Sequence, residues 1–95
     1  MSDALSAADR LDILELLARY AWAFDTRDGD AYAEVFTEDG VMEGPRSTIS
    51  GRADLRTWAA DFPPDVLQHR VTNTVIDGDA AEAQVRSYLV ATSVE

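Results

Sequence analysis

The segment from residue 11 to residue 30 constrains the chain most, because it predicts one long helix with a carboxylate on its apolar side. Apolar residues recur at helical spacing along this segment, and polar residues gather opposite them. Asp25 breaks the division, since at about 100° per residue it projects into the apolar arc beside Ala18 and Ala21. A buried carboxylate must be paired or hydrogen-bonded, or else it becomes neutral. Asp25 is therefore a candidate catalytic residue; the alternative is a half-exposed residue that orders the turn after the helix.

The boundaries of the other elements follow from caps, turns and changes of period. Ser6 and Asp9 form a capping-box pattern that starts the first helix, and the acidic run at 28–30 ends it. That run resembles a calcium loop, but its alternating oxygen ligands stop at Tyr32, so we expect no metal site. The further predicted elements are a short helix at 31–36, strands at 41–43 and 46–50, a helix at 52–61, and strands at 67–76 and 80–94.

The last two predicted strands form a hairpin with a three-residue loop at 77–79. This loop length pairs Val71 with Val85 and His69 with Ser87, and it keeps the apolar faces of both strands together. His69 is the only histidine of the chain, and the period of two places it with Asn73 on the inward face. His69 is thus a candidate general base, with a hydrogen-bonded core histidine as the alternative.

Composition restricts the partners of the protein. The 95 residues are expected to form one domain. A net charge of −10 without a basic patch predicts that the chain binds neither nucleic acid nor an anionic membrane. With no cysteine, the chain has no disulfides, thiolate metal sites or cysteine nucleophiles. Because we find no apolar leader or membrane-spanning segment, we predict a cytoplasmic protein.

Three stretches together resemble a known family: RYAWAFDTRDGDAYAEVFTEDGV, GRADLRTWAADF and LQHRVTNTVIDGDAAEAQVRSYLV. Their order and spacing are similar to the SnoaL-like branch of the NTF2-like superfamily, which includes scytalone dehydratase and lindane dehydrochlorinase. The resemblance implies an α+β fold, a cone-shaped barrel whose curved, mostly antiparallel sheet packs on helices around an apolar pocket. It also implies two further strands, so we expect either a domain that is incomplete at its C-terminus or a partner chain that covers its last strand.

The resemblance implies that Asp25 and His69 act as a catalytic dyad, in which the aspartate orients the ring and the histidine removes a proton from carbon. We therefore expect a cofactor-independent lyase or isomerase, a dehydratase or eliminase for example, that acts on a small hydrophobic or polycyclic molecule such as a polyketide. The predicted substrate-binding residues are Tyr20, Phe24, Met42, Trp58, Phe62, Val71, Asn73, Ser87 and Leu89.

Departures from the family pattern keep other functions open. Phe24 and Ser87 stand where the dehydratase has a tyrosine and a histidine, so side chains that polarise a carbonyl are missing. These departures favour a non-catalytic ligand-binding or oligomerisation module of the same fold. A third possibility is that Asp25 and His69 form a purely structural pair. Because a partner chain could cover the unpaired edge of the last strand, we also expect a homo-oligomer, either a dimer or a trimer.

Overall fold

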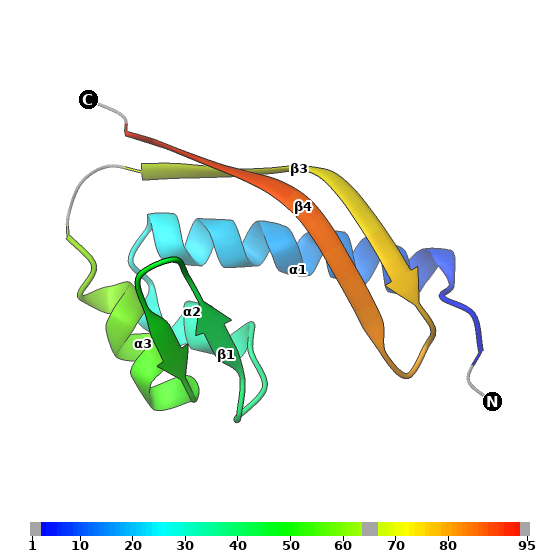
Figure 1. Ribbon diagram of the computed structural model, residues 1–95, viewed down its shortest axis with the longest axis horizontal. Helices are drawn as coiled ribbons and strands as arrows, with labels where there is room; N and C mark the ends of the chain where they lie inside the picture. The colour runs from blue at the N-terminus through cyan, green and yellow to red at the C-terminus, as the bar shows by residue number, and fades with distance from the viewer. Residues whose placement is uncertain (1–2, 64–66, 94–95) are drawn as a thin grey trace.

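The computed structural model describes residues 3–63 and 67–93, and it shows an α+β chain arranged around one long helix (Figure 1). The types and order of the elements are those predicted. They are α1 (Ala7–Asp25), α2 (Gly29–Glu34), β1 (Val41–Glu43), β2 (Thr48–Ser50), α3 (Arg52–Ala60), β3 (Leu67–Gly78) and β4 (Ala83–Ser93). The predicted last residue of the final strand, Val94, lies outside the described residues. None of the described helices is both long and apolar enough to cross a membrane.

Both ends of α1 are set by local contacts. The predicted capping box is present, since Ser6 Oγ accepts the Asp9 N–H at 3.0 Å and the Asp9 carboxylate accepts the Ser6 N–H at 3.0 Å. The helix ends at Asp25, earlier than predicted, because Arg27 adopts the left-handed region with φ of 58°. The hydroxyl of Thr26 donates to the Trp22 carbonyl oxygen at 2.8 Å and closes this end.

The acidic run after α1 joins α2 to α3. Asp28 is the N-cap of α2, where its carboxylate accepts the Ala31 N–H at 3.1 Å. Asp30 pairs with Arg56 of α3 at 2.6 Å. Gly29, between them, packs so closely on α3 that a Cβ there would overlap the Arg56 carbonyl oxygen. Within the described ranges, no three or more His, Cys, Asp or Glu side chains gather where they could share a metal ion.

The buried core lies between α1, α2 and α3. Two alanines, a leucine and two aromatic residues form it: Ala23, Phe24, Tyr32, Leu55 and Ala59. Aromatic rings surround it in edge-to-face contacts, with centroids 4.8 Å apart for Phe24 and Phe62 and 5.2 Å apart for Trp58 and Phe62. Met42 of β1 and Ile49 of β2 pack on the border of this core, so the short first hairpin closes it.

The second hairpin, β3–β4, packs along α1 through β3 (Figure 1). The predicted register was wrong, because Val71 pairs with Leu89 and His69 pairs with Ala91. The cause is the length of β3, which continues to Gly78 and leaves residues 79–82 as the connecting loop.

Asn73 was predicted on the inward face of β3, and this prediction was wrong because β3 contains a β-bulge at this residue. The register shifts between Thr72 and Val75, and Asn73 takes a left-handed backbone with φ of 56° and an exposed side chain. The inserted residue reverses the alternation that follows it. Thr74 then occupies the half-buried face, where its hydroxyl lies 2.9 Å from the Ser87 hydroxyl, and Val75 is exposed.

Candidate active site

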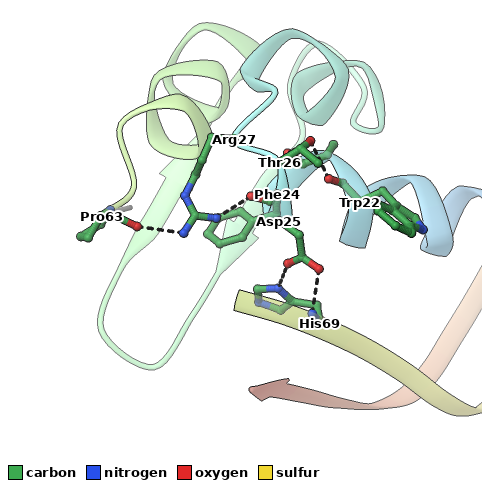
Figure 2. A network of polar contacts seen from close by, with 8 residues as sticks. Trp22, Phe24, Asp25, Thr26, Arg27, Pro63 and His69 are labelled. Atoms are coloured by element: carbon green, nitrogen blue, oxygen red, sulfur yellow. Dashed lines mark hydrogen bonds and ion pairs between the residues drawn. The ribbon is translucent and has the colours of Figure 1, made fainter. Parts of the chain in front are cut away.

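The structure brings Asp25, at the end of α1, against His69, near the start of β3 (Figure 2). The carboxylate uses both oxygens. Oδ1 contacts Nδ1 of the ring, and Oδ2 accepts the backbone N–H of His69 at 2.8 Å. Only 16% of the Asp25 side chain and 12% of the His69 side chain are exposed, so water screens their interaction weakly. The two residues form one unit held at two points.

This two-point contact determines which ring nitrogen carries the hydrogen. A carboxylate has only acceptor oxygens, so Nδ1 donates to Oδ1. In the neutral ring, Nε2 then keeps its lone pair and is the atom that accepts a proton. The edge of one ring meets the face of the other in the contact between Phe24 and His69, with centroids 5.1 Å apart, and this packing helps to hold the imidazole in place.

Arg27 holds the backbone around the dyad. Its guanidinium donates to the carbonyl oxygens of Phe24 at 2.7 Å, Phe62 at 3.3 Å and Pro63 at 2.8 Å, and the Phe24 and Pro63 contacts are drawn in Figure 2. It also lies over the Phe24 and Phe62 rings, 5.2 and 5.3 Å from their centroids. Arg27 thus ties the end of α1 to the segment that follows α3. Sequence patterns did not single out Arg27, although a basic side chain just after a helix often binds the last carbonyl groups.

Two hollows flank His69 along the groove between α1 and β3. The smaller, about 220 Å³, exposes about as much polar as apolar surface and is lined by Leu14, Leu17, Ala18, Ala21, Trp22, His69, Val71 and Thr74. The larger, about 410 Å³, is lined by Ala21, Trp22, Asp25, Thr26, Gln68, His69 and Arg70. Trp22 borders both hollows and was not predicted, although it lies one helical turn before Asp25 on the same helix. A further hollow of about 430 Å³ between α1 and α2 contains neither dyad residue, and we assign it no function.

The predicted substrate-binding residues are distributed over different parts of the molecule. Val71 lines the smaller hollow beside His69. Ser87 and Leu89 are exposed on β4, and Asn73 is exposed at the bulge. The five others belong to the aromatic core or its border and line neither of these hollows: Tyr20, Phe24, Met42, Trp58 and Phe62.

Tyr32 is a buried titratable group away from the dyad. It is fully buried in the core, and its ring centroid lies 5.3 Å from that of Tyr20. Within the described part of the chain its hydroxyl has no hydrogen-bond partner of normal geometry. Burial raises the pKa of Tyr32, and the neighbouring Tyr20 adds a smaller upward effect. Because Tyr32 lines neither hollow beside His69, we assign it to the core.

Comparison with known proteins identifies the relatives of this fold. The family model described as SnoaL-like domain matches residues 5–95. An Asp-to-Asn variant of Rv3472, a protein of unknown function from Mycobacterium tuberculosis, is 34% identical with a TM-score of 0.87, over 93% of this chain and 56% of that chain. A Nostoc punctiforme protein of unknown function with a cystatin-like fold is 31% identical with a TM-score of 0.86, over 95% of this chain and 70% of that chain.

A third similar structure carries the name of the superfamily. It is an NTF2-like protein with a cystatin-like fold from Novosphingobium aromaticivorans, 26% identical with a TM-score of 0.82, over 90% of this chain and 60% of that chain. A search of curated proteins found no match. The chain thus spans 56% of the length of the M. tuberculosis relative and 60% of that of the Novosphingobium relative.

Proposed function

Because the chain belongs to the SnoaL-like domain family, we propose that it is a small-molecule pocket protein whose Asp25 and His69 form a general-base dyad. The observation that carries the proposal is the two-point contact between the Asp25 carboxylate and His69, which leaves Nε2 free to accept a proton. The larger hollow beside the ring exposes more apolar than polar surface, which supports a hydrophobic substrate, since such a surface would exclude water from the reacting atoms.

In the proposed reaction, Nε2 removes a proton from a carbon of a hydrophobic or polycyclic substrate. The electron pair of the broken C–H bond expels a leaving group from the adjacent carbon in a dehydration or elimination, or it shifts a double bond in an isomerisation. Asp25 stabilises the imidazolium through Nδ1–H, and the ring later returns the proton to the leaving group or the product. These proton transfers need no cofactor.

Turnover tests the base directly. In a chain with demonstrated activity, we expect His69→Gln to lower kcat by about 10²- to 10⁴-fold, the usual contribution of a general base. KM should change much less than kcat, because His69 is only one of the residues that line the groove. Unchanged kcat in a folded variant would rule out the base role.

The tautomer of His69 tests the dyad before any substrate is known. In Asp25→Asn, the amide oxygen must accept the His69 backbone N–H, so the amide NH₂ group faces the ring. Nδ1 then accepts a hydrogen bond, and the ring hydrogen moves to Nε2. Nitrogen NMR of the single histidine should show Nδ1–H in the natural protein and Nε2–H in the variant. Asp12→Asn, at an exposed site of α1, is the matched control. An Nε2–H ring in the natural protein would contradict the proposal.

A module without chemistry is the second candidate, and the exposed apolar side chains of β4 favour it. Tyr88, Leu89 and Val90 all face solvent in the described structure. Such a surface suits self-association, so we propose that the chain forms a homodimer or homotrimer, whether or not it is catalytic. The cytoplasmic location and the lack of nucleic-acid binding stay predictions from composition.

A further inference from the structure

We propose that the groove between α1 and β3 binds an aromatic carboxylic acid, with its ring on Trp22 and its carboxylate on Arg70. This inference rests on the proposed function and narrows its substrate class from hydrophobic molecules to amphipathic acids. Both hollows have His69, Ala21 and Trp22 in their linings, so a single ligand can extend through the two hollows together.

The apolar half of the ligand site depends on Trp22. This side chain is 72% exposed, although a tryptophan is usually well buried in a folded protein. Beside it, the small side chains of Ala18 and Ala21 leave room over the helix, and Val71 forms the opposite wall. An aromatic ring placed there would cover Trp22 and gain ring-on-ring contact.

The polar half depends on the donors that remain available in the larger hollow. Both oxygens of Asp25 are occupied by His69, and the Thr26 hydroxyl donates to the Trp22 carbonyl oxygen at 2.8 Å. Arg70 makes no ion pair with any described carboxylate, and its Nη2 donates to Gln68 Oε1 at 3.3 Å. A guanidinium oriented by a neighbouring amide suits a carboxylate, which it binds with two parallel hydrogen bonds.

The arrangement of these groups sets the position of the ligand over the dyad. His69 lines both the smaller hollow and the larger hollow, which Arg70 also lines. An acid anchored at Arg70 and stacked on Trp22 would therefore place its intervening carbon atoms beside the imidazole. In this geometry, Nε2 would remove a proton from a ligand carbon atom close to the group that carries the carboxylate.

Binding of naphthoate and of neutral naphthamide, followed by NMR of the His69 ring and the Trp22 indole, tests the inference. The natural protein should bind naphthoate about fivefold more tightly than naphthamide, as expected for one exposed charge pair. Arg70→Gln should remove this preference and leave naphthamide binding unchanged. Trp22→Ala should weaken both ligands. Trp22 and Arg70 are both exposed, so thermal unfolding should confirm that each variant is folded.

Arg86→Gln is the matched control, because it removes the same charge from β4, where Arg86 faces Asp77 at 3.8 Å. It should keep the preference for naphthoate. Equal affinity for the two ligands in the natural protein, or an equal loss in Arg70→Gln and Arg86→Gln, would overturn the inference. If the natural protein has hydrogen on Nδ1 of His69 but does not prefer naphthoate to naphthamide, only this inference fails. If it has hydrogen on Nε2 instead, the proposed Asp25–His69 dyad fails as well.

Discussion

Tyr32 places in the centre of the core a hydroxyl group that makes no hydrogen bond of normal geometry with any described residue. A buried donor that is left unsatisfied costs about 1–3 kcal/mol. We therefore predict that Tyr32→Phe leaves the protein as stable as before or stabilises it by about 1 kcal/mol, because the ring packing is retained. Urea unfolding measures the change. Tyr88→Phe, at an exposed tyrosine, should have no effect, and a clear loss of stability in Tyr32→Phe would reveal a partner for the buried hydroxyl.

The same hydroxyl predicts a loss of stability at alkaline pH. The folded state raises the pKa of Tyr32 above its ordinary value of 10.0, so only the unfolded chain ionises freely just above that pH. The contribution to stability is complete below pH 10.0 and falls as the pH rises, by about 1.4 kcal/mol per pH unit. Unfolding free energies measured on both sides of this value should show the slope in the natural protein and a smaller slope in Tyr32→Phe.

At the scale of single residues, the helical and strand periods located Asp25 and His69 but not their surroundings. A carboxylate inside an apolar arc and a lone histidine on an inward face are visible in the sequence. Trp22, Arg27 and Arg70 were missed, because they do not belong to the apolar positions that these periods mark. Their positions depend on tertiary contacts, such as those of Arg27 with Phe62 and Pro63.

Among the elements, β3 shows why strand prediction was less accurate than helix prediction. The capping box and the acidic run mark the helix ends, and the prediction of α1, α2 and α3 needed only small corrections. The bulge at Asn73 leaves no such mark, and one inserted residue changes the face of every side chain after it. The predicted pairing of His69 with Ser87 was wrong for another reason, since β3 continues to Gly78 and the loop lies at 79–82.

Substitutions at Asn73 test the role of the bulge. Because Asn73 has a left-handed backbone with φ of 56°, we predict that Asn73→Val destabilises the protein by about 1–2 kcal/mol. Asn73→Gly should be neutral or slightly stabilising, since glycine adopts this conformation freely. Thermal unfolding compares the two variants with Thr72→Val, a control on the regular part of β3. Equal stability of Asn73→Val and Asn73→Gly would argue against the bulge.

The molecule as a whole has its core on one side of α1, and its exposed β3–β4 hairpin packs on α1 with strand β3 (Figure 1). The family resemblance correctly predicted the α+β fold class. Residue patterns alone did not predict how exposed the β3–β4 hairpin is. Leu89 lies on the face that was predicted to be inward, yet it is 52% exposed. Apolar strands that lack a described neighbour attract other chains.

We predict that this 95-residue chain associates in a concentration-dependent manner through β4. Leu89→Lys should weaken association about tenfold or more, because it removes a side chain worth about 1.5–3 kcal/mol when buried. Sedimentation measures the change, and Val75→Lys, which introduces the same charge on β3, should have a smaller effect. A monomer at all concentrations would contradict the proposed oligomer.

One carboxylate thus serves the architecture and the proposed chemistry at the same time. Since Oδ2 of Asp25 holds the main chain of β3 to α1, a descendant that had abandoned catalysis would still have reason to keep the aspartate. The imidazole of His69, by contrast, binds the side chain of Asp25 and not the main chain. When related sequences are sorted into enzymes and binding proteins, the residue at the position of His69 should therefore be the more informative marker, and an aspartate without it should indicate inheritance of the scaffold only.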